Sequence, residues 1–236
     1  MTRRRGVLPL RLKQLASNED ANTALEFAFV APAFIALILG TLHIALIYFA
    51  QAGLQSAVES AARLITTGQA QTSVVTSGGN THTGMSASDF KNAVCNGLTV
   101  KNVNGATVTY PSSLPPFLSC SRLTVNVQVV PSGCTSPTIT SPTYNYTTTN
   151  GTTTLTSTSA GYGTVTCSGS WSNSSAGLSG TQGDLVIVQL GYLWPTITAP
   201  MGLTFINQPN GNRLLIATYV ITVENYLCSD GTSSSC

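Results

Sequence analysis

The sequence predicts an α+β protein in which a long N-terminal transmembrane helix extends outside the membrane and leads into a small antiparallel sheet with one short helix. Three observations predict this fold: an uncharged apolar run fills residues 27–50, later segments alternate apolar with polar residues, and all six cysteines follow the run. The expected parts are a basic leader (1–25), a transmembrane helix (26–50), a helix extension (51–68) and an extracytoplasmic domain (69–236) with a Ser/Thr-rich insertion (132–182).

The composition excludes one broad class of partner. Charged residues make up only 8% of the chain, against about 25% in average soluble domains. Ser and Thr contribute 60 of the 236 residues, and beyond residue 50 five basic residues face five acidic ones. Nucleic acid is therefore not an expected partner, because its phosphates require clustered Lys and Arg.

The uncharged run from Phe27 to Ala50 is the candidate membrane span. Its 24 residues form a helix about 36 Å long, against roughly 30 Å of bilayer hydrocarbon. The run is too long for the apolar part of a cleaved secretory signal; the alternative is a buried core helix of a soluble protein. Five basic residues precede the span and favour a cytoplasmic N-terminus, an extracytoplasmic C-terminal domain and a lipid bilayer as partner: Arg3, Arg4, Arg5, Arg11 and Lys13.

The helical pattern continues beyond the span. Apolar residues recur at steps of three and four residues and leave an apolar stripe for a partner: Leu54, Ala57, Val58, Ala61, Leu64 and Ile65. One helix is expected from about Asn22 to about Thr67, and Gly68 is the expected stop.

Two segments of this helix look familiar. Residues 21–34 read Ala-Asn-Thr-Ala-Leu-Glu-Phe-Ala-Phe-Val-Ala-Pro-Ala-Phe, and residues 55–63 end in Ala-Ala-Arg. Together with a mid-span glycine, they resemble the N-terminal module of TadE/TadG-like proteins, the pilin-like pseudopilins of the Tad, or Flp, pilus apparatus. Residues 183–195 and 214–224 look like that family's last strands.

The resemblance implies a bacterial inner-membrane protein with a pilin-like body. Its partners would be other pilin or pseudopilin subunits, the Tad machinery and a prepilin peptidase. Such a peptidase would cut between Ala21 and Asn22, so that Glu26 becomes the fifth residue of the mature chain. The sequence departs from the usual pattern, because Ala21 stands where such peptidases usually want Gly, and Glu19 and Asp20 precede it. An uncut anchor is the alternative.

The expected assembly residues are Glu26, Phe27, Pro32 and Gly40, and all but Phe27 permit two interpretations. Glu26 could pair with the new α-amino group of a neighbouring subunit and set helix register, or extend to the headgroups near its helix N-terminus. Pro32 could kink the helix and Gly40 could permit close helix contact, or both are simply tolerated in lipid. For His43, which has no second ligand at i±4, no metal site is expected.

Outside the membrane, residues 69–86 are expected to form a polar linker in which His82 is solvated. A short helix is expected from Ser88, its cap, to Gly97. Four strands are expected, and the alternation in 123–130 predicts a half-buried one: Thr107–Tyr110, Leu123–Val130, Leu185–Leu193 and Leu214–Glu224.

The insertion is very rich in hydroxyl residues, with 26 Ser/Thr among the 50 residues from Ser132 to Thr181. Residues 147–154 are typical of the tip of a long hairpin or of a mobile loop. We expect a surface-exposed insertion.

Six cysteines in an oxidising compartment predict disulfides, with 15 possible connectivities. We expect neighbours to pair: Cys95 with Cys120, Cys134 with Cys167, and Cys228 with Cys236. No Cys-x-x-Cys spacing occurs, so zinc is not expected.

Catalysis lacks its usual parts. Ser88 and Lys91 fit a Ser-x-x-Lys pattern, but the companion motifs of penicillin-binding enzymes do not occur and the same residues explain a helix start. We expect no enzyme activity, no cofactor and no metal. The favoured function is a structural TadE-like pseudopilin or minor pilin that supports assembly of a Tad (Flp, type IVb) pilus in adhesion or secretion. The alternative is a membrane-anchored surface-binding module that no prepilin peptidase processes.

Overall fold

The computed structural model describes residues 19–77, 79–102, 104–137, 139, 142–150, 152–157, 161–165, 171–174, 182–196, 205–208 and 211–224. The chain divides into two compact units. Residues 1–46 with 197–205 form the first unit, and residues 47–196 with 206–236 form the second, which we call the head. The leader up to residue 18, Cys167, Cys228 and Cys236 lie outside the described residues.

A single helix, α2 (Glu19–Thr66), contributes to both units. It begins three residues before the expected start and ends one residue before the expected end. Gly68 follows with φ 72°, and its N–H donates to the Ile65 carbonyl at 3.0 Å. Because glycine adopts this left-handed conformation without a Cβ penalty, Gly68 stops the helix as its sequence position predicts.

The head is built on a five-stranded sheet with the order β11-β10-β5-β8-β9. Strand β10 pairs antiparallel with both neighbours, whereas β8 pairs parallel with β5. The bounds are β5 (Leu123–Val130), β8 (Gly161–Val165), β9 (Trp171–Ser174), β10 (Leu185–Pro195) and β11 (Asn212–Thr222). The fold class is therefore α+β, as predicted. Strand β5 has its expected bounds, β10 is two residues longer, and β11 is shifted by two residues.

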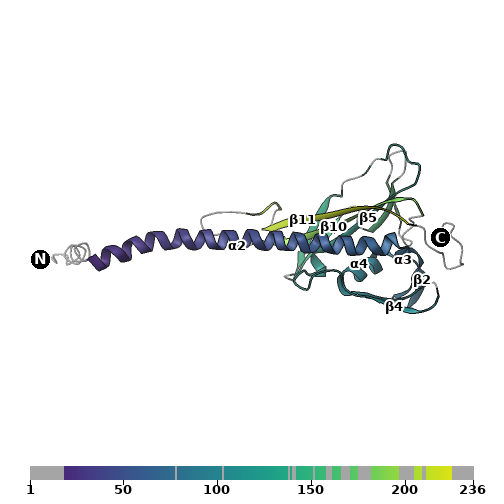
Figure 1. The fold of residues 1–236 in the computed structure, drawn as a ribbon, viewed down its shortest axis with the longest axis horizontal. Coiled ribbons are helices and arrows are strands. Elements are labelled where there is room, and N and C mark those ends of the chain that lie inside the picture. The colour runs from purple at the N-terminus through teal and green to yellow at the C-terminus, as the bar shows by residue number, and fades with distance from the viewer. Residues whose placement is uncertain are drawn as a thin grey trace, which may run out of the picture. The chain divides into compact units, whose positions relative to one another are not determined.

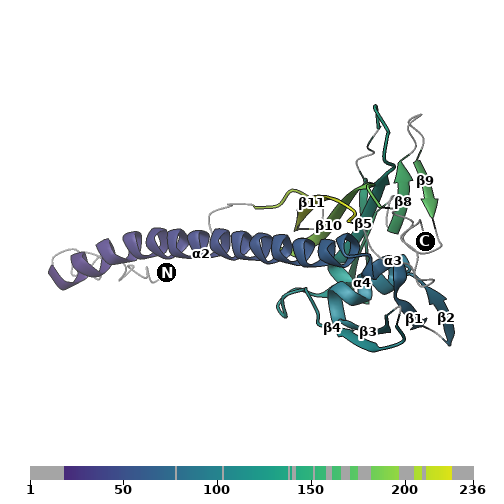
Figure 2. The same cartoon turned by 45° about the vertical axis from the view of Figure 1, so that its right-hand side comes forward.

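The C-terminal half of α2 packs on this sheet. Figures 1 and 2 both show it alongside β11 and β10. The Gln51 Nε2 donates to the Ile216 carbonyl at 2.8 Å, and the Glu224 N–H donates to the Thr66 carbonyl at 3.2 Å. The apolar stripe is buried here except for the half-buried Leu64. Exposure is 0% at Ala50, Leu54, Ala57, Val58, Ala61, Ala62 and Ile65. The stripe left over for a partner is thus covered by the head's own sheet.

The expectation of a polar linker over 69–86 is wrong. A short helix α3 (Gln69–Thr72) is followed by β1 (Val74–Ser77) and β2 (Asn80–Thr83). They join β3 (Leu98–Lys101) and β4 (Thr107–Tyr110) in a second sheet with the order β2-β1-β3-β4. Strand β4 has its expected bounds. Strands β1, β2 and β3 were not expected, because a strand of four residues gives too few positions to establish a period.

Helix α4 (Ala87–Asn96) lies between β2 and β3 in sequence, and its cap differs from the expected one. Ser86, not Ser88, is the N-cap, and Asp89 completes a capping box with it. The reason is spacing: Ser86 stands three residues before Asp89, as the reciprocal hydrogen bonds of a capping box require.

The half-buried character expected for β5 is also wrong, because all eight of its residues are buried. The insertion supplies part of the cover as a hairpin of β6 (Tyr144–Thr149) and β7 (Thr152–Ser157). The tip falls where the sequence predicts a hairpin tip, but Thr153 and Leu155 are buried and β8 joins the main sheet. The described part of the insertion is therefore integrated into the head rather than wholly surface-exposed.

Candidate functional site

The N-terminal half of α2 exposes an unusually large apolar surface. Fourteen large apolar side chains between Leu25 and Phe49 are at least 40% exposed, with Phe29 at 75% and Phe27 at 72%. The helix has an apolar window of mean hydropathy 2.3, of which only 17% is buried. Soluble monomers rarely expose apolar patches of this extent. By length and composition this helix can cross a membrane, and its low burial argues against the core helix of a soluble protein.

Of the expected assembly residues, Glu26, Phe27 and Pro32 lie on this surface or at its start, whereas Gly40 is buried. Glu26 and Phe27 are exposed, and Glu26 forms no ion pair with any described residue. Pro32 lies inside the helix and leaves one carbonyl of the preceding turn without its N–H partner. A Cβ built on Gly40 meets no described atom within 4 Å. Nothing within the described chain therefore requires glycine at position 40.

The expected cleavage position lies close to the helix start. Ala21 and Asn22 follow Glu19, the first helical residue, by two and three positions. The bond between them is thus in the first turn, where helices fray most readily.

One contact of the first unit has no signal in the sequence. The imidazole ring of His43 stacks on the ring of Phe205, with centroids 5.1 Å apart and planes at 27°. The two residues are 162 positions apart, so no local pattern pairs them. The structure gives His43 an aromatic neighbour rather than a second ligand, and the described residues contain no cluster of three or more His, Cys, Asp or Glu that could hold a metal ion.

A second glycine of α2, Gly53, marks where the head holds the helix. A Cβ at this position would lie 2.9 Å from the Pro115 ring and 3.4 Å from Phe117. One turn earlier, the ring of Phe49 stacks on Phe117 with centroids 4.9 Å apart. Gly53 lets the loop approach the helix closely. The sequence alone does not predict this role, because a lone glycine in a helical pattern has several explanations.

The cysteines lie in the head wherever they are described. Cys95 of α4 and Cys120 of the short helix η1 (Cys120–Arg122) form a disulfide, with Cα atoms 5.7 Å apart. Cys134 is also disulfide-bonded, to a partner outside the described residues. The Cys95–Cys120 bond ties the C-terminal end of α4 to the η1 helix, which directly precedes β5.

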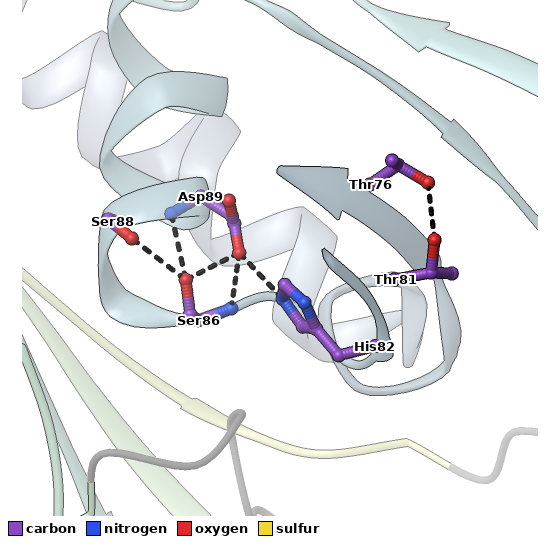
Figure 3. Close-up of polar contacts among 6 residues, drawn as sticks. All are labelled: Thr76, Thr81, His82, Ser86, Ser88 and Asp89. Atoms are coloured by element: carbon purple, nitrogen blue, oxygen red, sulfur yellow. Dashed lines mark hydrogen bonds and ion pairs between the residues drawn. The ribbon is translucent and has the colours of Figure 1, made fainter. Parts of the chain in front are cut away.

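Ser86, Asp89 and His82 form a small polar cluster at the start of α4 (Figure 3). Asp89 is 1% exposed and accepts from the Ser86 N–H at 3.0 Å, from the Ser86 hydroxyl, and from His82 Nε2 at 2.9 Å. Burial raises the pKa of Asp89, but the hydrogen bonds from Ser86 and His82 outweigh it and hold the pKa below its ordinary value. His82 was expected to be a solvated residue of a polar linker; it lies instead in β2, and its side chain is 36% exposed and bonded to Asp89.

The cluster does not have the order of a catalytic triad. In a Ser-His-Asp triad the histidine lies between the serine and the carboxylate, whereas here the carboxylate lies between the serine and the histidine. These contacts instead fix the start of α4.

Ser88 and Lys91 line one cavity of about 280 Å³ together with Thr124 and residues 154–156. Burial lowers the pKa of Lys91. The hydrogen bond of Ser88 goes to the Ser86 hydroxyl at 2.9 Å, and no hydrogen bond joins Ser88 to Lys91 in the described chain. The pair therefore lacks the contact by which a lysine would activate a serine.

These features define the class: an α+β protein whose N-terminal helix is long and apolar enough to cross a membrane and continues into the head. The model of the family "TadE-like protein" matches residues 22–63, less than a fifth of the chain. The matched segment includes Glu26, Pro32, Gly40 and Gly53, and its TadE-like character is confirmed. Neither a curated protein nor a solved structure matches the chain.

Proposed function

We propose that this protein is a structural, non-enzymatic subunit of a Tad (Flp, type IVb) pilus system, a TadE-like pseudopilin or minor pilin. Its N-terminus would lie in the cytoplasm, α2 would cross the bacterial inner membrane, and the head would lie outside. The observation that carries the proposal is the coincidence of the TadE-like match with the apolar surface of α2. The partners would be lipid, other pilin subunits, the Tad machinery and a prepilin peptidase.

The exposed half of α2 supports packing among helices. Its large apolar side chains would contact lipid or neighbouring helices, and Gly40 would allow one neighbour to approach closely. Glu26 lacks an ion-pair partner in its own described chain. A carboxylate near hydrocarbon is costly unless it is paired, so an α-amino group of an adjacent processed subunit is its proposed partner.

The N-terminus of the protein from cell membranes tests the processing step. The protein would be recovered from cells with and without a prepilin peptidase, and its terminal residues sequenced. We expect a start at Asn22 only when the peptidase is present. An intact leader in both strains would refute processing and favour the alternative, an unprocessed membrane-anchored surface-binding module.

A pair of variants tests the assembly role of Glu26. Glu26→Gln removes the proposed charge, while Glu59→Gln removes an exposed carboxylate from the same helix within the head. We expect Glu26→Gln to reduce surface pili while the protein level in the membrane is unchanged, and Glu59→Gln to leave pili intact. Equal behaviour of the two variants would contradict the role of Glu26.

The alternative function makes the insertion the active part. Deleting residues 136–159 would remove β6 and β7 and uncover the sheet, so it would not separate recognition from folding. A triple substitution to Ala at the exposed hairpin positions Thr147, Thr149 and Thr152 keeps the buried Thr153 and Leu155. Loss of surface adhesion with normal pili would favour the surface-binding module; normal adhesion would favour the structural subunit.

A further inference from the structure

Strand β11 forms one edge of the five-stranded sheet, so one side of its backbone has no neighbouring strand. Its even-numbered residues direct their N–H and C=O groups to that side. The odd-numbered positions face β10: the Val223 N–H donates to the carbonyl of Asp184, which directly precedes β10. The even-numbered positions face away from β10: the Ile216 carbonyl accepts from Gln51 of α2. Antiparallel strands alternate in this way along their length.

Both ends of this outer edge are closed by the chain itself. At the start, the Asn212 carbonyl accepts from the Gln208 N–H at 3.1 Å, and Leu214 exchanges two hydrogen bonds with the Asn207 side chain at 2.7 and 3.3 Å. At the far end, the Glu224 N–H donates to the Thr66 carbonyl.

Between these ends, the outward backbone groups of Thr218, Val220 and Thr222 form no hydrogen bond with any described residue. The three residues extend over about 13 Å of strand. Natural proteins usually protect such edges with charges, proline, a bulge or a covering helix or loop. Residues 218–222 contain no charged residue and no proline, and a groove separates them from α2, which runs alongside. The protected ends and the open centre leave space for one short strand.

A groove of about 590 Å³ runs beside this open stretch. One wall of the groove is formed by Arg63 and Thr66 at the end of α2 and by Thr67, which follows the helix. The other wall is β11 from Tyr219 to Thr222. Leu185 and Glu224 also line the groove. Val220 is 53% exposed. The groove is large enough for an extended peptide of a few residues.

Two charged residues line the groove, Arg63 and Glu224, and both are exposed. Glu224 lies at the far end, which its own N–H closes by donating to the Thr66 carbonyl, whereas Arg63 lies on the α2 wall and forms no ion pair with any described residue. Its guanidinium can bind a carboxylate through two parallel hydrogen bonds. A matching peptide therefore has an acidic side chain among uncharged β-forming residues.

A second copy of this chain fits less well. Along the head, α2 runs from Gln51 beside Ile216 to Thr66 beside Glu224, parallel to β11. Symmetric pairing of two β11 edges is antiparallel, so the two α2 helices would run in opposite directions. Two chains anchored in one bilayer by their N-terminal helices cannot do so; this exclusion alone rests on the proposed membrane anchor.

We propose that the β11 edge from Thr218 to Thr222 binds an extended, acidic-residue-bearing segment of a different protein, which adds to the sheet as a sixth strand. Main-chain hydrogen bonds would supply affinity, and Arg63 would select the acidic side chain. The site lies entirely in the head and does not require the membrane span.

The test uses the full chain in detergent and a labelled, acetylated and amidated heptapeptide, Thr-Val-Thr-Glu-Val-Thr-Val. Binding is measured by fluorescence anisotropy with up to 1 mM protein, and amide exchange is measured by NMR. We expect saturable binding and slower exchange at Thr218, Val220 and Thr222. Val220→Pro removes an outward N–H and should weaken binding about fivefold to tenfold, whereas Val220→Ala keeps the N–H and should bind like wild type.

Arg63→Gln should weaken this peptide about fivefold but leave its Gln analogue unaffected. Circular dichroism checks that each variant folds. Absence of saturable binding, equal affinity of Val220→Pro and Val220→Ala, or slow exchange of the three amides without peptide would each overturn the proposal. Protection that depends on protein concentration, with dimers in sedimentation, would identify a second copy as the occupant instead.

Discussion

The two halves of helix α2 share one backbone but present opposite surfaces. Up to Phe49, the outward side chains are large and apolar, with fourteen of them at least 40% exposed. From Ala50 onward, the contact face is made largely of alanine and is fully buried against the sheet. Small residues allow close packing of a helix on a fixed surface, whereas bulky ones favour lipid or mobile neighbours. The difference teaches that helical periodicity alone does not distinguish the half that the head covers from the half that it leaves exposed.

A charge placed in each half should give the largest contrast. Ala57→Asp puts a carboxylate at a position with 0% exposure, and we expect it to destabilise the head by at least about 3 kcal/mol. Leu37→Asp, at an exposed position, should leave the head stable but oppose membrane insertion by about 3 kcal/mol. Thermal unfolding in detergent and membrane fractionation measure the two effects. Loss of head stability in Leu37→Asp would break the comparison.

The disulfide should matter only for the head. Cys95 and Cys120 are separated by 25 positions, so opening the bond should lower the free energy of unfolding by about 3 kcal/mol. The double variant Cys95→Ser with Cys120→Ser should unfold at lower denaturant concentration while its membrane fraction stays unchanged. Identical unfolding midpoints of the variant and the oxidised wild type would contradict this expectation.

Acid should weaken the head through Asp89. The folded-state pKa of Asp89 lies below its ordinary value of 3.8, so its contribution to stability is complete above that value and disappears as pH falls through the lower folded-state value. Asp89→Asn should lower stability at pH 7 by about 1 kcal/mol, as loss of a capping contact does, and flatten the decline below pH 4. Denaturant unfolding from pH 2 to 7 measures both. An unchanged acid slope in the variant would assign the decline to other groups.

The two glycines of α2 should give the smallest effect. Gly53→Ala places a Cβ 2.9 Å from the Pro115 ring; the clash opposes a gain in helix propensity of about 1 kcal/mol. We expect a net loss of about 1 kcal/mol in head stability. Gly40→Ala meets no described atom and should leave the head unchanged while reducing pilus assembly. Thermal unfolding and pilus counts check the pair, and a stabilised Gly53→Ala head would show that the loop yields.

The sequence predicts regular elements where one pattern dominates. Helix α2, β4 and β5 lie at or within a few residues of their expected bounds, because their apolar residues recur with clear helical or strand periods. Strand β2 was not predicted because Asn80, Thr81 and His82 give no apolar alternation, and β1 was not predicted because its four residues begin with two adjacent valines. For α4, Ser88 was the expected cap, whereas the observed cap is Ser86. Only the three-residue spacing from Ser86 to Asp89 distinguishes the two serines.

Long-range contacts were not accessible from local patterns. In β5, polar residues alternate with valines and predict a solvent-exposed face of the strand. The structure buries all three of these polar residues, Thr124, Asn126 and Gln128. Part of the cover over this sheet is the β6–β7 hairpin, which begins at Tyr144. Strand β8 pairs in parallel with β5, although the paired residues are more than thirty positions apart in the sequence. Such pairings depend on chain topology rather than on neighbouring residues. For the same reason, the His43–Phe205 stacking and the open edge of β11 appear only in the structure.

The parallel course of α2 and β11 in the head has a mechanical consequence. A pull along the helix loads the contacts from Gln51–Ile216 to Thr66–Glu224 together, in shear, rather than one after another as in unzipping. The buried alanines between these two contacts share the load, because each would have to slide along the head. The contact between α2 and the head therefore resists force best when the force acts along the helix axis.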